Sequence, residues 1–499
     1  MPVDEQTVVA GVGADADVEA VIGLETHVEL STATKLFCGC PNEFGSEPNT
    51  NICPVCLGLP GSLPVLNRQA VDFALRLAAA LGFRVPERSI FARKNYFSPD
   101  MPKDFQISQY EEPILADGRL EVDGTVVRIE RAHLEEDTGK TVHVGGGGRI
   151  HEADHSLVDY NRAGVPLMEI VSRPDLRSAD QARDYVTELR GVLHALGLSD
   201  VKMEEGSLRV DANVSVRPVG SAELGTKVEV KNMNSLRSLG RAIDYEIARQ
   251  VEQLEAGERV IQETRHWDEA DGRTHGMRTK EGSSDYRYFP EPDLVPLAPS
   301  DEQRQHGGAS LPELPAARRE RLVADWGVAD REARTLVDVD GLADYAEAAV
   351  LALIAGTPRD VAHWCTVDVL AYLREAGASP AVLPLPPDGL AELVALVADG
   401  TISRSQAKDV LGECLREPKR PKQVVEERGL AQVSDEGELR AVVDALLAEH
   451  PDDVAAYRAG DEKERKKKFG FLMGEAMKAT RGRGNPQLLR GLLENQLGG

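Results

Sequence analysis

The stretch Val21-Ile-Gly-Leu-Glu-Thr-His-Val-Glu-Leu30 alternates apolar and polar side chains along its length. Because successive side chains of a β-strand point to opposite faces, this pattern predicts a strand with one apolar and one polar face. The polar face carries Glu25, His27 and Glu29. Two carboxylates beside an imidazole can bind a metal ion or transfer protons. An ordinary strand of an antiparallel sheet, with its polar face in solvent, gives the same pattern and stays an alternative.

Polar strand faces of this kind recur farther along the chain. In the segment 209–217 small apolar residues alternate with polar ones, among them Asp211, and in 227–231 two lysines share a face with a glutamate. Three acidic residues, 135–137, end the strand-like segment 126–134. A polar sheet face that carries both carboxylates and cations suits the binding of Mg²⁺ together with a phosphorylated ligand. Mg²⁺ is bound by a few carboxylates plus phosphate oxygens, and the cations would offset the charge of the phosphoryl group.

Four of the six cysteines form two close pairs, Cys38-Gly-Cys40 and Cys53-Pro-Val-Cys56. Two thiol pairs with glycine and proline at the turns predict a tetrahedral Zn²⁺ site in the loop 38–56. Its role would be structural, because four protein ligands leave no open position. Unrelated or redox-active thiols are the alternative. Cys365 and Cys414 stand alone, and we expect both to be small buried hydrophobic residues.

The chain of 499 residues is long enough for about three domains. We expect a disordered leader over 1–17 and then a mostly antiparallel β-sheet cradle domain over 18–297. From about Leu311 the pattern becomes helical and rich in Ala and Leu. Proline-rich segments indicate domain boundaries, which we place near 298 and 410. We therefore expect a helical domain over 298–410 and a small α-helical tail domain over 411–499. The predicted class is α+β.

Composition excludes several classes of protein. With 83 acidic and 58 basic residues, the net charge of −25 argues against a protein that coats nucleic acid non-specifically. The chain contains no run of about 18 apolar residues, so we expect no membrane-spanning helix. The start of the chain also lacks the features of a secretory signal. We therefore expect a cytoplasmic protein without membrane contact.

The motifs resemble one family, the B subunit of the tRNA-dependent aspartyl/glutamyl-tRNA amidotransferase. The matching stretches are GLETHVEL (23–30), the cysteine-containing segment 38–67, RKNYFSPDMPKDFQISQY (93–110), HLEEDTGK (133–140), SLVDYNRAGVPLMEIVSRPD (156–175), KMEEGSLRVDANVSVRP (202–218), KVEVKNMNS (227–235), and ETRHWDE (263–269) through DYRYFPEPDLVP (285–296). They cover most of residues 21–297. The segment from 471 to 487 is similar to the family's YqeY-like tail domain.

The resemblance implies a two-step reaction on misacylated tRNA. ATP phosphorylates the side-chain carboxylate of Glu on glutamine tRNA or of Asp on asparagine tRNA, and ammonia then displaces phosphate. In such a heterotrimer, the A subunit releases ammonia from glutamine and passes it through a tunnel. The small C subunit straps the other two together, and the B subunit binds the tRNA.

Site residues follow from the matching motifs. The resemblance implies that Mg²⁺ and the phosphoryl group are held by Glu25 and His27 (GLETH), Glu136 (HLEED), Glu169 (PLMEI) and Asp211 (RVDAN). Glu135 is a weaker candidate than its neighbour Glu136. Lys94 (RKNYF) would lie at the mouth of the ammonia tunnel or near the activated carboxylate. The four cysteines of the 38–56 loop match the zinc-binding members of the family.

The end of the chain reverses the sign of the overall charge. Residues 463–490 contain nine basic and two acidic residues. This reversal predicts a contact with the tRNA backbone, with a solvated helix face as the alternative. The residues expected to bind tRNA are Lys466, Lys467, Lys468, Lys478, Arg481 and Arg483.

The segment 142–155, with a glycine run and His143, His151 and His155, is longer than usual for the family, and we interpret it as a loop feature.

Two other functions would fit parts of this pattern. A non-catalytic RNA-binding scaffold would leave the carboxylate faces merely solvated, and a synthetase-like ligase would act alone. The recurrence of carboxylates inside matching motifs argues against the scaffold. The absence of HIGH-type and KMSKS-type motifs argues against the ligase, and no long insertion resembles the archaeal E-subunit relative. Whether Glu-tRNA or Asp-tRNA is the substrate depends on the synthetases of the source organism.

Overall fold

The computed structural model describes residues 17–145, 153–277, 286–309, 311–430, 436–480 and 484–498. It divides into two compact units, Met1–Pro315 and Ala316–Gly499. The first combines antiparallel-dominated sheets with helices and the second is helical in its described part, which confirms the predicted α+β class. The boundaries expected near 298 and 410 stay predictions, and the expected leader lies almost wholly outside the described residues.

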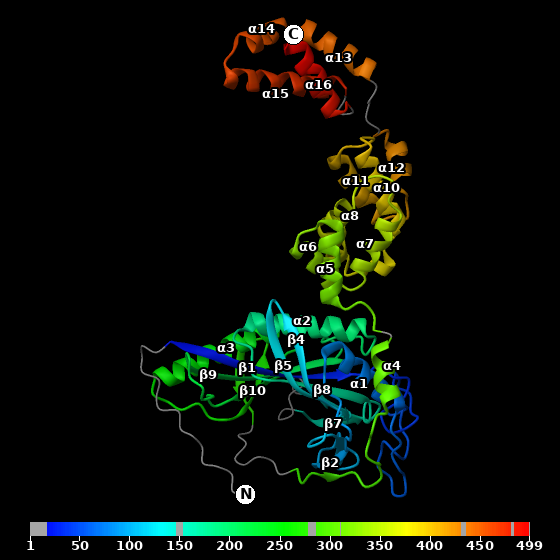
Figure 1. Cartoon of the computed structure of the whole chain (residues 1–499), viewed down its shortest axis with the longest axis vertical. Coiled ribbons are helices and arrows are strands. Elements are labelled where there is room, and N and C mark those ends of the chain that lie inside the picture. The colour runs from blue at the N-terminus through cyan, green and yellow to red at the C-terminus, as the bar shows by residue number, and fades with distance from the viewer. Residues whose placement is uncertain are drawn as a thin grey trace. The chain divides into compact units, whose positions relative to one another are not determined.

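An eight-stranded sheet forms the centre of the first unit, in the order β12-β11-β10-β9-β1-β8-β5-β4 (Figure 1). Its strands are β1 (Val18–Glu29), β4 (Leu115–Val122), β5 (Thr125–Glu136), β8 (Pro166–Ser172), β9 (Leu208–Pro218), β10 (Val228–Lys231), β11 (Thr264–Asp268) and β12 (Arg273–Gly276). All neighbours pair antiparallel except β10 and β11. The predicted strand thus becomes β1, which lies between β8 and β9.

Helices cover the apolar face of this sheet. Helix α2 (Ala179–Ala195) packs against α3 (Leu236–Glu255) and β4, and α3 packs against β9; α1 (Arg68–Leu81) contacts β4 and β5 (Figure 1). Ile22 and Leu24 of β1 are fully buried in the resulting core. The serine hydroxyls at the N-caps of α2 and α3 accept backbone N–H groups of the first turn, which the helix itself leaves without partners. The polar face of β1 is left on the opposite side of the sheet.

Two small sheets and one helix complete the described part of the first unit. Strands β13 (Phe289–Pro290), β2 (Ala92–Asn95) and β3 (Phe105–Ser108) pair in that order, and β6 (Lys140–Val144) pairs with β7 (His155–Asp159). Helix α4 (Asp301–Ala309) packs on α1. Of the predicted loop 142–155, His143 lies in β6 and His155 in β7, whereas residues 146–152, with His151, lie outside the described residues.

The second unit is helical and contains two separate hydrophobic cores. Its helices are α5 (Pro315–Trp326), α6 (Asp330–Asp338), α7 (Leu342–Leu351), α8 (Pro358–Trp364), α9 (Leu370–Ala376), α10 (Pro387–Ala398), α11 (Arg404–Cys414), α12 (Pro421–Arg428), α13 (Glu436–Glu449), α14 (Pro451–Ala459), α15 (Glu462–Ala479) and α16 (Pro486–Gly498). A π-helical turn, Cys365–Val369, joins α8 to α9. Cys365 and Cys414 are buried in the first core, as predicted.

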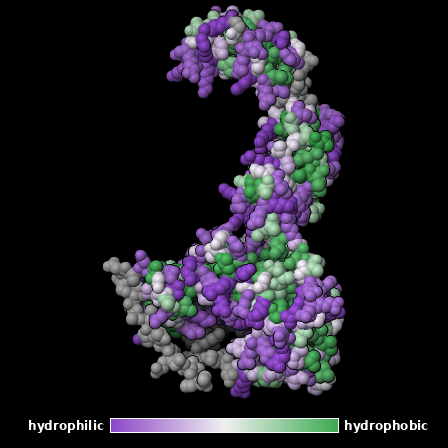
Figure 2. All heavy atoms as spheres, viewed as in Figure 1, coloured by the Kyte–Doolittle hydropathy of each residue, from purple (hydrophilic) through white to green (hydrophobic). Residues whose placement is uncertain are grey.

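Leucines of α13, α15 and α16 fill the second core, and Val454 and Tyr457 of α14 pack against it. Hydrophilic side chains dominate the visible face of this bundle (Figure 2). Across the described residues of both units, no helix combines the length and apolar character needed to cross a membrane.

Candidate active site

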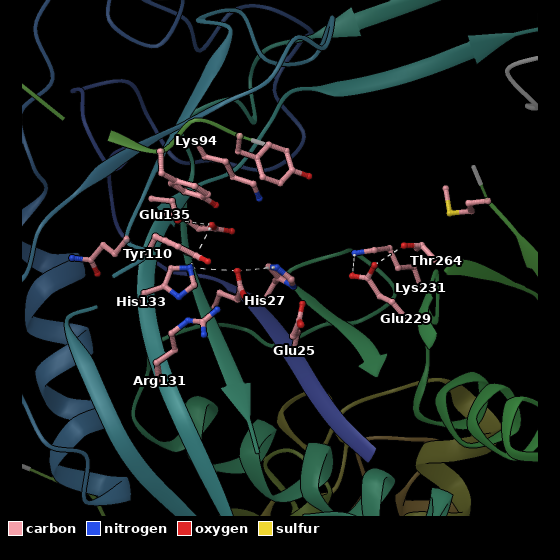
Figure 3. A pocket seen from close by; sticks show the side chains of 16 residues that line it. Glu25, His27, Lys94, Tyr110, Arg131, His133, Glu135, Glu229, Lys231 and Thr264 are labelled. Atoms are coloured by element: carbon pink, nitrogen blue, oxygen red, sulfur yellow. Dashed lines mark hydrogen bonds and ion pairs between the residues drawn. The ribbon is translucent and has the colours of Figure 1, made fainter. Parts of the chain in front are cut away.

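The register of the sheet places imidazole and carboxylate side chains in one row across its polar face. His27 of β1 lies opposite Glu169 of β8, and Glu169 lies opposite His133 of β5. Glu169 Oε2 is 3.6 Å from His27 Nε2 and 3.3 Å from His133 Nε2. Glu135, two residues beyond His133 on the same strand face, is 3.6 Å from His133 Nε2 (Figure 3). The four side chains form one charged group, in which His133 and Glu135 are buried and His27 and Glu169 are partly exposed.

Three members of this row are spaced to bind a cation. His27, Glu135 and Glu169 each offer a ligand atom, and these atoms lie within 4.8 Å of one another. Burial raises the pKa of both glutamates, but the neighbouring histidines outweigh burial and hold each pKa below its ordinary value. Burial lowers the pKa of His133, but Glu169 and Glu135 raise it to about 9. The carboxylates are therefore ionised at neutral pH, as a metal ion requires. Burial lowers the pKa of His27, but Glu169 raises it above its ordinary value, so His27 would release a proton on binding a metal ion.

A second group of acids lies beside the first. Glu25 of β1 is opposite Asp211 of β9, and with Glu229 of β10 they bring three carboxylates within 4.8 Å of one another. Lys231 Nζ lies 2.7 Å from Asp211 Oδ2 and 3.0 Å from Glu229 Oε1. Asn213 Nδ2 donates a hydrogen bond of 2.9 Å to Glu25 Oε1. The mixed-sign floor predicted from the sequence is present on three adjacent strands.

A cavity of about 560 Å³ lies over both groups. Its lining consists of Glu25, His27, Lys94, Ser108, Gln109, Tyr110, Arg131, His133, Glu135, Glu169, Glu229, Lys231, Thr264, Met277, Tyr286 and Tyr288 (Figure 3). Tyr110 and Tyr288 stack with their ring centroids 4.5 Å apart, and Lys94 Nζ lies 5.0 Å from the ring centroid of Tyr286. The cavity thus has an acidic floor and an aromatic wall that carries one ammonium group.

Glu136 belongs to neither of these two groups in the described structure, so its predicted place among the Mg²⁺ ligands stays a prediction. Its carboxylate pairs with Lys103 and accepts the backbone N–H of Ile107 at 2.8 Å. The reason is the period of two along β5, which sends Glu135 to the cavity and Glu136 to the other side. The same period would have identified His133, which was not among the predicted site residues. The weaker candidate, Glu135, is the one that faces the cavity.

The four clustered cysteines meet in space. Their sulfur atoms lie within 4.8 Å of one another, and all four thiols are free. Cys53 Sγ and Cys56 Sγ are 3.8 Å apart. Tetrahedral zinc with Zn–S bonds of about 2.3 Å separates its sulfurs by about 3.8 Å, whereas a disulfide bond is about 2.05 Å long. The spacing fits a four-thiolate metal site and not a disulfide.

The basic residues predicted to bind tRNA fall into three groups. Lys466 and Lys467 are exposed on α15. Lys468 pairs with Asp453 at 2.6 Å and Lys478 with Glu475 at 2.5 Å, so part of their charge is neutralised within the bundle. Arg481 and Arg483 lie outside the described residues.

Comparison with known proteins gives one consistent match over nearly the whole chain. The family described as the GatB/GatE catalytic domain matches residues 20–305, and the family described as the GatB domain matches residues 344–497. The chain is 51% identical to the B subunit of the aspartyl/glutamyl-tRNA(Asn/Gln) amidotransferase of Thermosynechococcus vestitus, over 96% of each chain. It is 50% identical to the proteins of the same name from Trichodesmium erythraeum and Carboxydothermus hydrogenoformans, over 96% of this chain and 98% of each relative.

Proposed function

Because this chain belongs to the family of aspartyl/glutamyl-tRNA(Asn/Gln) amidotransferase B subunits, we propose that its cavity activates and amidates a side-chain carboxylate on misacylated tRNA. The substrate is Glu carried by tRNA(Gln), Asp carried by tRNA(Asn), or both. The chain works in the cytoplasm in a heterotrimer with an A subunit, which releases ammonia from glutamine, and a C subunit. The enzyme is an ATP-dependent carbon–nitrogen ligase.

The reaction has two balanced steps. A carboxylate oxygen of the Glu or Asp side chain attacks the γ-phosphorus of ATP, the bond to the β-phosphate oxygen breaks, and ADP leaves. The product is an acyl phosphate. Ammonia then attacks the acyl carbon, the carbon–oxygen bond to phosphate breaks, and a proton leaves the nitrogen to give the amide and inorganic phosphate.

Each group on the cavity floor has a part in the first step. Glu135, Glu169 and His27 would hold Mg²⁺, and Glu25, Asp211 and Glu229 offer a second acidic group beside it. Bound Mg²⁺ supplies positive charge to phosphate oxygens. The two glutamates of the first group suit this ion, because Mg²⁺ prefers carboxylate oxygens and their pKa values keep them ionised.

Two ammonium groups offset the charge that develops on the transferring phosphoryl group. Lys231 is fixed on the floor by Asp211 and Glu229, and Lys94 faces the cavity from β2. Fixed cations of this kind stabilise a transition state without reorganising. Because Lys94 lines the cavity, it would also lie near the activated carboxylate during the second step.

The aromatic wall limits the access of water. An acyl phosphate hydrolyses unless the site excludes water before ammonia arrives. The stacked rings of Tyr110 and Tyr288 cover one side of the cavity, and Tyr286 packs edge-on against Tyr288 with ring centroids 6.2 Å apart. These side chains would keep the intermediate dry.

Two further groups support this function away from the cavity. The four cysteines would hold a structural Zn²⁺ that orders the 38–56 loop, because their sulfur spacing fits that ion. The exposed lysines of α15, Lys466 and Lys467, would contact the tRNA backbone. Recognition of tRNA by a local basic surface is compatible with an acidic chain.

The observation that carries the proposal is the convergence of two groups of carboxylates under one cavity in a chain of this family. The test uses the heterotrimer reconstituted with Asp211→Asn and, as a control, with Glu121→Gln, which changes an exposed glutamate of β4. We expect Asp211→Asn to abolish tRNA-dependent ADP formation while tRNA binding is kept, and the control to behave as wild type. Normal amidation by Asp211→Asn would disprove the assignment of this cavity.

A further inference from the structure

The ammonium group of Lys35 is buried beside the cysteine loop without an acidic partner. The residue is 0% exposed, although lysine is almost never fully buried unless it is paired. Its Nζ donates to the carbonyl oxygens of Asn51 at 2.8 Å and Tyr160 at 3.3 Å. Within the described ranges, no carboxylate oxygen forms an ion pair with it. An isolated buried cation is costly, so an anion must be supplied from elsewhere.

One acidic side chain, Glu136, reaches the same glycine: its Oε2 would lie 3.8 Å from a Cβ placed on Gly164. The single negative charge of this carboxylate is already paired with Lys103 at Oε1, which also accepts the Ile107 N–H. Glu136 therefore does not serve as the counter-charge of Lys35.

The four thiols are the other candidate anions, and they are close. A Cβ placed on Gly164 would lie 3.5 Å from Lys35 Cδ and 3.6 Å from Cys56 Cβ, so both side chains pack against the same glycine. Four thiolates around one Zn²⁺ carry a net charge of about −2.

We propose that Lys35 is the counter-charge of the zinc–thiolate centre and a positioning residue for its loop. The ammonium offsets part of the negative charge of the four sulfurs. Its two hydrogen bonds tie the cysteine loop, through Asn51, to the segment after β7, through Tyr160. This inference rests on the zinc site of the proposed function, but its test does not depend on amidation.

The test measures zinc retention in the purified heterotrimer. Lys35→Met removes the charge and the donors, and Lys35→Gln removes the charge but keeps an N–H donor. Metal content per chain and the rate of zinc release to a chromogenic chelator are measured at one pH. Lys140→Met, at an exposed lysine of β6, is the matched control. Changes in residues that support a metal ligand commonly weaken binding by about 10–100-fold.

We expect both Lys35 variants to release zinc at least about tenfold faster than wild type, and Lys140→Met to match wild type. A second measurement compares melting temperatures with zinc bound and after zinc is stripped. Loss of the charge should lower the melting temperature of the zinc-bound form and raise that of the stripped form, because the stripped form buries an uncompensated ammonium.

The outcomes separate the two claims. Wild-type zinc retention in Lys35→Gln, or equal shifts in melting temperature with and without zinc, would overturn the counter-charge role while leaving the zinc site intact. A wild-type chain that binds no zinc and keeps four free thiols would overturn the zinc site itself, and the role of Lys35 with it.

Discussion

Substitution of Glu169 by glutamine removes one negative charge from the centre of the cavity floor and leaves the shape of the side chain unchanged. Glu169 Oε2 lies 3.3 Å from His133 Nε2 and 3.6 Å from His27 Nε2, and the side chain is only 15% exposed. Two unit charges about 4 Å apart interact by about 4 kcal/mol at an effective dielectric constant of about 20. The substitution removes one such attraction, between the Glu169 carboxylate and the cation that it would hold. At 1.36 kcal/mol per factor of ten, this loss predicts a rate lower by about a thousandfold.

The assay is tRNA-dependent ADP formation by the heterotrimer carrying Glu169→Gln, with excess Mg²⁺ and misacylated tRNA. The exposed Glu121→Gln variant is the control for a lost surface charge, and tRNA binding reports that the complex is intact. We expect ADP formation to fall by about three orders of magnitude with unchanged tRNA binding. A rate within about threefold of wild type would refute the claim that this carboxylate helps to hold Mg²⁺ in the cavity.

Three further predictions test the wall, the tail and the core. Tyr288→Ala should raise the ratio of ATP hydrolysed to amide formed, because water gains access to the acyl phosphate, and Tyr288→Phe should keep the wild-type ratio; equal ratios in all three proteins would contradict the sheltering role. Charge reversal at Lys466 and Lys467 together should raise the KM for tRNA about tenfold with little change in kcat, whereas Lys422→Glu on α12 should not; an unchanged KM would remove the tail from tRNA recognition. Leu24→Ala, at a side chain 1% exposed, should lower the free energy of unfolding by about 2–5 kcal/mol in urea melts, and Val126→Ala, 51% exposed, by far less; a loss below about 1 kcal/mol would contradict the packing described for β1.

Much of the local structure follows from side-chain period alone. The alternation around Glu25 and His27 predicted β1 and its polar face, because a period of two is fixed by strand geometry. The two cysteine pairs likewise predicted a cluster of four thiols, since only one or two residues separate the cysteines within each pair. Helical spacing of the C-terminal leucines indicated a helical end, and residues such as Leu439 and Val443 are buried as that spacing requires.

The composition of the cavity depends on long-range register and could not be read from one segment. His27 and His133 both meet Glu169 only because β8 lies between β1 and β5 in the sheet, although these strands are far apart in the chain. In the run Glu135-Glu136, the family motif favoured the second glutamate, whereas the face of β5 presents the first. The burial of Lys35 could not be predicted from the sequence, because an isolated lysine in a polar loop is normally exposed.

The central claim, that the side-chain carboxylate is phosphorylated in this cavity, is tested most directly by isotope transfer. Glu on tRNA(Gln) or Asp on tRNA(Asn) is prepared with ¹⁸O in its side-chain carboxylate and converted by the wild-type heterotrimer with ATP and glutamine. An acyl phosphate intermediate requires that one carboxylate oxygen leave with the phosphate. We predict one ¹⁸O in inorganic phosphate for each amide formed; amide formation with unlabelled phosphate would contradict the claim.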